Sequence, residues 1–254
     1  MKSYFLIAVL IGLVYSFPVE DEAQDPSEDQ VQEPDLTEGD MILTPKQKEI
    51  LFNPPKTRNG VTNPSLRWPG GVVYYQFHSS IPSKDRTTIV NALNEIERNT
   101  CVRFRQGSNS QNHFIRVTNN AAGCFAYVGY IKTAGQQLNL GNNCVHKGII
   151  IHEFLHAIGF YHQQSSSDRD QFVNIHLGNV ISGQEHNFNK YTSSQVTNFG
   201  YRYDYGSIMH YGPYDFSKNG RPTISAKLSG AGSMGQRNGL SGTDIAKIKR
   251  MYSC

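Results

Sequence analysis

The sequence has few features that would assign it to a specialised class of protein. Its 254 residues include four cysteines and one tryptophan, and no two cysteines have the Cys-x-x-Cys spacing of many structural zinc sites. Lysine and arginine exceed aspartate and glutamate by only three, so the total charge does not indicate nucleic-acid binding. Beyond residue 17, no apolar run approaches the roughly 20 residues that a membrane helix needs. We therefore expect a globular protein with no nucleic-acid partner and no membrane anchor.

The first 16 residues have the layout of a secretory signal peptide. Lys2 precedes an apolar run over residues 5–14, and the small residue Ser16 follows this run. A membrane anchor is the alternative, but Pro18 and a series of acids end the run too early for one. We therefore expect cleavage after Ser16 and a protein that is secreted into the extracellular space.

The charges are distributed unevenly along the rest of the chain. Residues 18–40 hold ten acids, three prolines and no base, a composition that cannot bury enough apolar surface to fold alone. Over residues 18–58 there are 11 acids and 4 bases, whereas residues 59–254 hold 19 bases and 10 acids. The sequence thus predicts an acidic tail or mask ahead of a basic body. A trypsin-like protease could separate the two by cutting between Arg58 and Asn59.

Hydrophobic periodicity predicts a sheet with helices in the first half of the body. β-branched and aromatic residues at 72–77 predict a strand, and apolar residues at helical spacing over 84–99 predict a helix. The mostly apolar stretch 148–159 predicts a buried helix that ends at its final glycine. Further strands are expected at residues 102–104, 114–117, 125–131 and 136–140, and further helices at residues 44–52 and 243–251. The second half of the body is expected to be mostly irregular.

Secretion implies that the cysteines mature in an oxidising compartment and form two disulfides. Three pairings of the four cysteines are possible. The short separation of Cys124 and Cys144 favours a local bridge, which would leave Cys101 to pair with the last residue, Cys254. A bridge that closes so long a loop stabilises by on the order of 4–5 kcal/mol in the chain-entropy model.

The predicted helix at residues 148–159 carries two histidines at metal-ligand spacing. His152 and His156 are four residues apart, so they lie on one face of a helix and can share an ion. Gly159 can adopt the positive φ that ends a helix, which lets His162 return to the same ion. Three histidines with an open fourth position are typical of catalytic zinc, because structural sites use four protein ligands. Polar residues that recur on a helix by chance are the simpler alternative, and the third histidine argues against it.

Glu153 follows the first of these histidines and is the candidate general base. Zinc polarises a carbonyl group and lowers the pKa of a bound water, and a neighbouring carboxylate can carry the proton of that water to a leaving amine. The combination predicts peptide-bond hydrolysis. Glu153 could instead complete an iron site of two histidines and one carboxylate, but its side chain points about 100° away from that of His152 around the helix.

Residues 152–162 read His-Glu-Phe-Leu-His-Ala-Ile-Gly-Phe-Tyr-His and reproduce the HExxHxxGxxH signature of the metzincins. Residues 168–170 (Asp-Arg-Asp) and 203–211, which end in Ser-Ile-Met-His-Tyr, resemble the astacin branch of that group. The similarity runs from about residue 59 to Cys254. The resemblance implies an α+β fold: an N-terminal subdomain with a twisted mixed sheet and two helices, a mostly irregular C-terminal subdomain, and a zinc cleft between them.

The resemblance also implies roles for two residues of the second half. Met209 would lie beneath the zinc ligands, although packing in the core alone would also explain it. Tyr211 would be an extra zinc ligand that moves off the metal to hold the transition-state oxyanion, the alternative being a buried aromatic with a satisfied hydroxyl. The resemblance further implies that the first cysteine pairs with the last and that the middle two pair with each other.

Latency and activation are implied by resemblance as well, with departures from the family pattern. Astacins place the aspartate of a Phe-x-Gly-Asp sequence on the zinc; Asp40 would take that place here, but Thr37 replaces the phenylalanine. Asp40 would otherwise be one of ten acids on a solvated tail. Gln163 stands where the family has a glutamate that receives the new N-terminus, here Asn59, and Ser166 replaces an arginine. We expect the hydrogen bond between Gln163 and the new N-terminus to be weaker than its counterpart in the family, and we expect Gln163→Glu to strengthen it.

The sequence as a whole predicts a secreted, zinc-dependent endopeptidase with one zinc ion per chain, made as a latent proenzyme. Its parts would be a signal peptide (residues 1–16), a propeptide (17–58) and one peptidase domain (59–254), acting as a monomer on proteins or peptides. Substrates are expected to add a strand along the segment near residues 124–127. The rivals are a catalytically inactive zinc-containing protein that holds a peptide in the same cleft, and a zinc-storage or structural protein.

Overall fold

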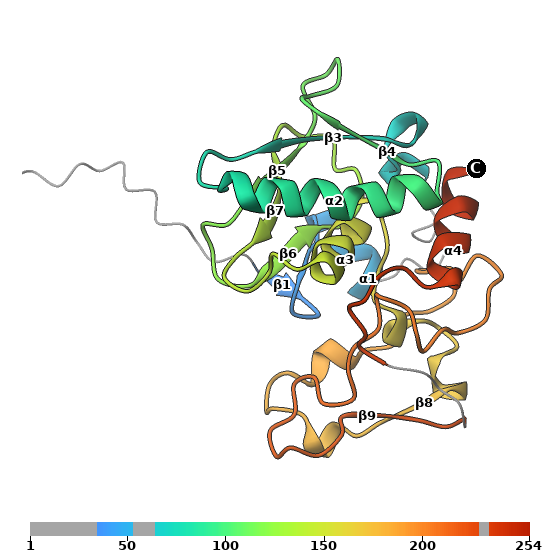
Figure 1. The fold of residues 1–254 in the computed structure, drawn as a ribbon. Helices are drawn as coiled ribbons and strands as arrows, with labels where there is room; N and C mark the ends of the chain where they lie inside the picture. Colours follow the sequence, from blue (N-terminus) through green and yellow to red (C-terminus); the bar gives the residue numbers. More distant parts are fainter. Residues whose placement is uncertain (1–34, 53–63, 229–233) are drawn as a thin grey trace, which may run out of the picture. The chain divides into compact units, whose positions relative to one another are not determined.

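The computed structural model describes residues 35–52, 64–228 and 234–254, which form a sheet with helices and a second, mostly irregular part (Figure 1). The expected signal peptide and the expected cleavage site at Arg58 and Asn59 lie outside these residues. The helices are α1 (Pro45–Phe52), α2 (Ser83–Asn99), α3 (Lys147–Ala157) and α4 (Gly242–Tyr252). The strands are β1 (Leu36–Thr37), β2 (Met41–Ile42), β3 (Val72–Phe77), β4 (Arg103–Gln106), β5 (Ile115–Thr118), β6 (Cys124–Tyr127), β7 (Gln136–Leu140), β8 (Val173–Ile175) and β9 (Ile224–Ala226).

Seven strands form a mixed sheet in the order β1-β2-β6-β7-β5-β3-β4. The neighbours among β7, β5, β3 and β4 are parallel, whereas β6 is antiparallel to β7 and β1 is antiparallel to β2. Strand β2 pairs in parallel with β6, with Met41 opposite Ala126 and Ile42 opposite Tyr127. Residues that the sequence assigns to the propeptide therefore extend the sheet along β6, the strand expected to receive substrates.

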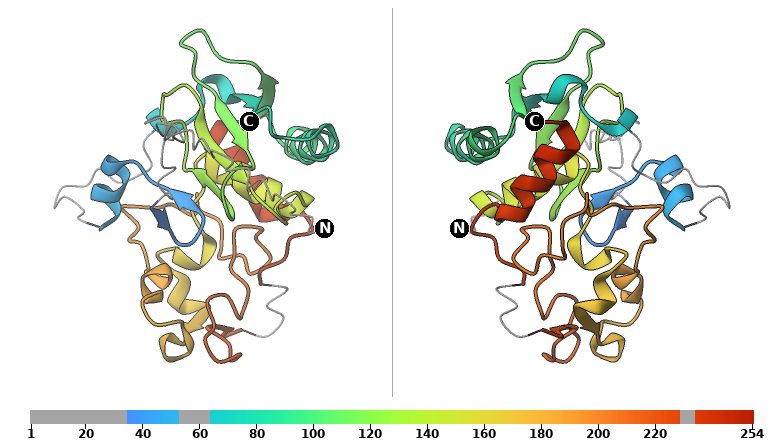
Figure 2. Two further views of the ribbon diagram at one scale, coloured as in Figure 1. Left: turned by 90° about the vertical axis from the view of Figure 1, so that its left-hand side faces the viewer. Right: turned by 90° about the vertical axis from the view of Figure 1, so that its right-hand side faces the viewer.

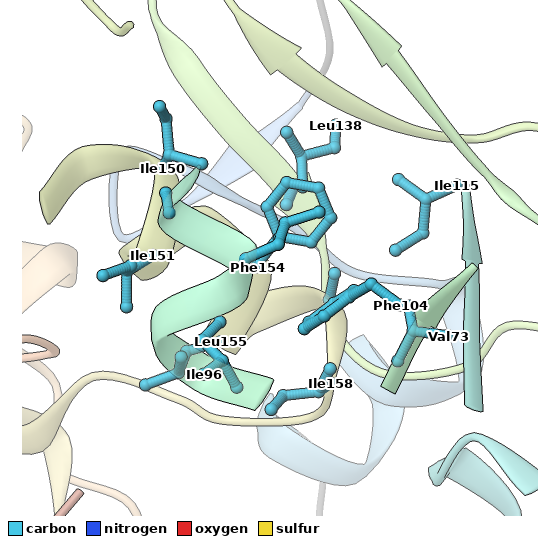
Figure 3. Close-up of a cluster of buried hydrophobic side chains, with 14 of the residues drawn as sticks. Val73, Ile96, Phe104, Ile115, Leu138, Ile150, Ile151, Phe154, Leu155 and Ile158 are labelled. Carbon is cyan, nitrogen blue, oxygen red and sulfur yellow. The ribbon is translucent and has the colours of Figure 1, made fainter. Parts of the chain in front are cut away.

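The main core lies between the sheet and the helices α2 and α3 (Figure 3). Helix α2 buries one face, at Ile89, Leu93 and Ile96. Helix α3 is buried around most of its circumference, and Phe154 of this helix packs edge-on against Phe104 of β4, with the ring centroids 5.4 Å apart. Helix α3 thus packs against both the sheet and α2, which makes it a rigid support for the side chains at its C-terminal end.

Two features determine how the chain leaves α3: the backbone conformation of Gly159 and a hydrogen bond from Trp68. Gly159 has a φ of +111°, in the region that favours glycine, and a Cβ at this position would lie 2.7 Å from Cε of Met251. The indole Nε1 of the buried Trp68 donates a hydrogen bond of 2.9 Å to the carbonyl of Ala157. The helix therefore ends sharply where the sequence predicted, and the next residues turn back toward its last two turns.

Helix α4 returns the chain from the irregular part to the sheet (Figure 2). Its N-terminus is a capping box, in which Ser241 and Asp244 each accept a hydrogen bond from the backbone N–H of the other. The last residue, Cys254, is bonded to Cys101, and the other disulfide joins Cys124 to Cys144. Both expected disulfides are confirmed.

The remainder of the described chain differs from the sequence prediction in small ways. The described residues 160–228 and 234–240 contain mainly 3-10 turns and the two-stranded sheet of β8 and β9, so the expected irregular half is confirmed. Strand β6 ends at Tyr127 rather than continuing to residue 131, because Gly129 has a φ of +74° and the chain bends there. None of the helices described is long and apolar enough to cross a membrane.

Candidate metal centre

Three histidines converge at the end of α3. His152 and His156 project from consecutive turns of this helix, and His162 comes from the segment beyond Gly159. Nε2 of His152 lies 3.2 Å from Nε2 of His156 and 3.3 Å from Nε2 of His162. All three side chains are buried. The structure therefore brings together the three histidines that the sequence singled out.

Asp40 completes this group from the opposite side. Its carboxylate oxygens lie 3.1 Å from Nε2 of His152, 3.4 Å from that of His156 and 3.2 Å from that of His162. An ion bound tetrahedrally, with bonds of about 2.0–2.1 Å, separates its ligands by about 3.3–3.4 Å. The observed spacing fits such an ion, and three imidazole nitrogens with one carboxylate oxygen form a donor set that zinc accepts.

Each histidine is oriented by a hydrogen bond at its other ring nitrogen. The acceptors for Nδ1 of His152, His156 and His162 are the carbonyl oxygens of Ile208 and Phe160 and the Oε2 atom of Glu38, at 2.8, 2.8 and 2.7 Å. When Nδ1 donates its proton to these acceptors, Nε2 carries a free lone pair. In its neutral form each of the three imidazoles is therefore held in the tautomer that binds a metal ion.

Burial and mutual charge set the protonation of the centre. Burial lowers the pKa of His152 to about 3. Burial also acts to lower the pKa of His162, but the charges and hydrogen bonds of Asp40 and Glu38 outweigh it and raise that pKa to about 9. Burial opposes the ionisation of Asp40, yet His162 and His156 hold its pKa well below the usual value. The centre therefore stabilises the carboxylate form of Asp40, which is the form that binds a cation.

Glu153 lies beside this centre as a buried carboxyl group. It is 2% exposed, and in the described part of the chain its Oε2 atom has no hydrogen-bond partner. Burial raises its pKa well above the usual value, the charge of Asp40 adds to this shift, and Arg237 opposes it. A carboxyl group with a raised pKa beside a metal centre is suited to accept a proton and return it.

Met209 and Tyr211 both lie close to the histidines. Met209 is buried in the main core, and its carbonyl accepts a 2.9 Å hydrogen bond from the backbone N–H of Gln163, the residue after His162. The ring centroid of Tyr211 lies 4.7 Å from that of His162. The Tyr211 hydroxyl donates a 2.5 Å hydrogen bond to the carbonyl of Glu38, so this hydroxyl is engaged by the same segment that carries Asp40.

Comparison with known proteins agrees with this geometry. The model of the astacin peptidase family matches residues 60–253. The chain belongs to the astacin family. It is 38% identical over 219 residues to "Zinc metalloproteinase nas-4" of Caenorhabditis elegans, a match that covers 86% of this chain and 69% of the relative. It is 39% identical over 262 residues to "Protein SpAN" of Strongylocentrotus purpuratus, which covers 97% of this chain but only 41% of SpAN.

A solved astacin-like structure supports the fold. The chain resembles high choriolytic enzyme 1, a hatching enzyme zinc-protease of Oryzias latipes, with a TM-score of 0.68 and 36% identity over 74% of this chain and 93% of that one. The predicted fold, a mixed sheet with helices and an irregular remainder, is confirmed. As an astacin, the chain is a zinc metalloendopeptidase, and its three histidines and Asp40 are positioned to bind one ion.

Two residues at the centre of this astacin were not identified from the sequence. Glu38 is one of ten acids in residues 18–40, and nothing in that composition distinguishes it. Asp244 is buried and accepts hydrogen bonds from Ser207 Oγ at 2.6 Å and from the backbone N–H of Ile208 at 2.9 Å. Asp244 thereby fixes the turn whose carbonyl orients His152. The signal for Asp244 is its position three residues after Ser241, as in a capping box.

The departure from the family pattern at Gln163 has a structural partner. Gln163 lines a cavity of about 70 Å³ beside His162, together with Lys247 of α4. Nζ of Lys247 donates a 2.5 Å hydrogen bond to Oε1 of Gln163, and both side chains are buried. Ser166, the other departure, donates to Asp168 at 2.9 Å. A positive side chain therefore already lies beside Gln163, where the resemblance placed an incoming terminal amine.

We expect Gln163→Glu to stabilise the uncut chain as well as the processed one. The new carboxylate would meet Lys247, and a bond between two charged groups is stronger than one between an ammonium and a neutral amide by about 1 kcal/mol. Urea unfolding of the uncut chain measures this gain, and the gain should disappear when Lys247→Met is added. Stabilisation that appears only after processing would show that the terminal amine is the partner instead.

Proposed function

We propose that the protein is a secreted endopeptidase made as a latent proenzyme, in which residues 35–52 cover the active site until they are removed. The position of Asp40 among the three histidines carries this proposal, since Asp40 belongs to the acidic segment that the sequence separates from the body. The same segment pairs with β6 through β2. It therefore keeps substrates from the metal centre and from the sheet edge at once.

Several contacts hold this segment on the body. Apolar side chains from both sides form one cluster: Met41, Leu43, Leu51, Val128 and Tyr191. Gln47 donates a 2.8 Å hydrogen bond to the carbonyl of Val128, and Gln195 of the body donates a 2.6 Å hydrogen bond to the carbonyl of Leu51. Cleavage after Arg58 breaks none of these contacts. Activation therefore requires residues 35–52 to dissociate or to be digested after the chain is cut.

In the processed enzyme, the chain's own residues would divide the reaction between them. Zinc, when bound, polarises the scissile carbonyl and lowers the pKa of a water. Glu153 accepts a proton from this water as the oxygen of the water bonds to the carbonyl carbon. It then gives that proton to the nitrogen of the scissile amide as the C–N bond breaks. Tyr211, released from the carbonyl of Glu38, donates to the oxyanion. The freed edge of β6 pairs with the main chain of the substrate.

Activation would follow cleavage by a trypsin-like protease between Arg58 and Asn59. The basic stretch Lys56-Thr57-Arg58 and its distance from Trp68, which resembles the spacing in astacins, support this position. N-terminal sequencing of the active form checks it. The expected first residue is Asn59, and a start several residues away would contradict the assignment.

The test of the function is the digestion of a denatured protein. The processed, zinc-loaded chain should cleave casein or gelatin at internal bonds, and a zinc chelator should abolish this cleavage. No cleavage by a folded, metal-loaded sample would favour the rival in which the cleft only holds a peptide. Spectra of the cobalt-substituted processed enzyme should show a position open to water besides the three histidines and Tyr211, whereas a site closed by four protein ligands would favour a zinc-storage or structural role.

Tyr211→Phe should lower the turnover number of the processed enzyme by roughly 10²–10³, the usual effect of losing one oxyanion donor. KM should change little, because the hydroxyl acts in the transition state and the aromatic ring is kept. Steady-state kinetics on a fluorogenic peptide measures both constants. An increase in KM with an unchanged turnover number would show that Tyr211 binds substrate and does not stabilise the oxyanion.

A further inference from the structure

Residues 38–40 hold His162 at both of its ring nitrogens. Asp40 lies 3.2 Å from Nε2 of His162, and Oε2 of Glu38 lies 2.7 Å from Nδ1 of the same ring. Only Gly39 separates the two acids; it has a φ of +82°, and a Cβ there would lie 2.9 Å from the ring of Phe216. Glu38 also has a positive φ, of +51°. This tight turn directs two carboxylates at one imidazole.

Glu38 is bound by the body through all of its oxygen atoms. The residue is 2% exposed. Besides the bond to His162, its Oε1 atom accepts a 2.8 Å hydrogen bond from Ser165 Oγ, and its backbone carbonyl accepts the hydroxyl of Tyr211. A carboxylate buried to this degree needs such partners to offset the loss of water. Glu38 therefore makes a specific contact with the metal centre and is not one of the solvated acids of its segment.

The three histidines differ in what orients them. His152 and His156 donate from Nδ1 to main-chain carbonyls of the body, Ile208 and Phe160, which remain after processing. Within the described residues, the partner of His162 at Nδ1 is Glu38, which is removed with the propeptide. A carboxylate at this position fixes the ring and makes the histidine a stronger ligand than a carbonyl does. His162 therefore has its strongest support only in the uncut chain.

We propose that Glu38 is a positioning residue of the latent metal centre: it orients His162 and strengthens the bond of this ligand to zinc. The inference rests on the proposed function, since it takes residues 35–52 as a removable propeptide. Binding is reciprocal, so the factor by which the docked propeptide raises the affinity of the centre for zinc is also the factor by which zinc strengthens the docking of the propeptide, and Glu38 contributes to this factor. Glu38 thus acts together with Asp40 to retain the zinc ion and to keep the propeptide bound.

The test compares the zinc affinity of uncut chains by competition with a chromophoric chelator. Glu38→Gln keeps the size of the side chain and removes its charge, and it should weaken zinc binding roughly 10-fold, at the lower end of the usual effect of such partners. The control is Glu49→Gln, the same substitution at an exposed position of the same segment, which should bind zinc as the wild type does. Equal affinities of the Glu38→Gln and wild-type chains would overturn the proposal.

A second comparison decides the same point if Glu38→Gln does not fold. Both proteins compared carry Tyr211→Phe, so that the hydroxyl freed by processing cannot serve as a ligand. The uncut Asp40→Ala chain then lacks the carboxylate ligand but keeps Glu38, so it should still bind zinc more tightly than the processed enzyme does. Equal affinity of these two proteins would overturn the role of Glu38.

The experiment also separates this inference from the proposed function. The processed forms of wild type and Glu38→Gln are the same polypeptide, so their casein cleavage tests the function alone. Normal cleavage with unchanged zinc affinity of uncut Glu38→Gln overturns only the role of Glu38. Absence of cleavage by the processed, metal-loaded chain overturns the proposed function.

Discussion

Glu153→Gln in the processed enzyme is expected to lower turnover by roughly 10²–10⁴, the usual contribution of a general acid–base group, while zinc stays bound. The amide fills the same buried space but cannot accept the proton of the attacking water. The histidines are unaffected, because Glu153 orients none of them: His152 and His156 donate from Nδ1 to the carbonyls of Ile208 and Phe160, which remain after processing. Casein kinetics together with the zinc content of the purified variant measure both effects.

A matched control for this variant is Glu185→Gln. Glu185 accepts a hydrogen bond from the backbone N–H of Gly183 in the irregular part of the chain, and its substitution should leave turnover within a factor of about two. Near-normal turnover of Glu153→Gln would show that another group takes the proton. Loss of zinc from this variant would show that Glu153 is a metal ligand, as in the alternative of two histidines and one carboxylate.

Asp40→Ala is expected to make the uncut chain partly active and to speed its processing. The substitution removes the carboxylate from the fourth position but leaves the apolar cluster and the pairing of β2 with β6. The loss of about 1.5–3 kcal/mol of interaction with charged groups should raise the fraction of uncut chains with an open centre by roughly 10–100-fold. Cleavage of a small fluorogenic peptide, measured without an activating protease, reports this fraction.

Asp35→Ala is the matched control for Asp40→Ala. The side chain of Asp35 is 86% exposed and contacts Lys48 at 2.5 Å, and exposed ion pairs contribute little to stability. The Asp35→Ala chain should therefore stay as latent as the wild type. Equal activation of both variants would mean that latency depends on the bulk charge of the segment or on steric cover, and that Asp40 is not a metal ligand.

The parts of the centre that the sequence predicted are those that depend on local geometry. The spacing of His152 and His156 specifies one helical face, and Gly159 specifies where that face ends and the chain turns back. These rules operate within about ten residues, so a single sequence contains them. The same holds for strands β3 and β7, whose bounds match the expected residues 72–77 and 136–140.

The parts that the sequence did not predict depend on contacts between distant segments. Met41 and Ile42 are two apolar residues beside an acidic stretch, and they form a strand through their pairing with β1 and β6. Lys247 lies 84 positions from Gln163, and their hydrogen bond exists because α4 returns to the end of α3. Glu38 is distinguished from the other acids of its segment only by its contact with His162.

The most direct test of the central claim is a crystal structure of the zinc-loaded, uncut chain. We expect one ion bonded to Nε2 of His152, His156 and His162 and to a carboxylate oxygen of Asp40, each at about 2.0–2.2 Å. A water molecule as the fourth ligand, with Asp40 turned away from the metal and into solvent, would contradict it.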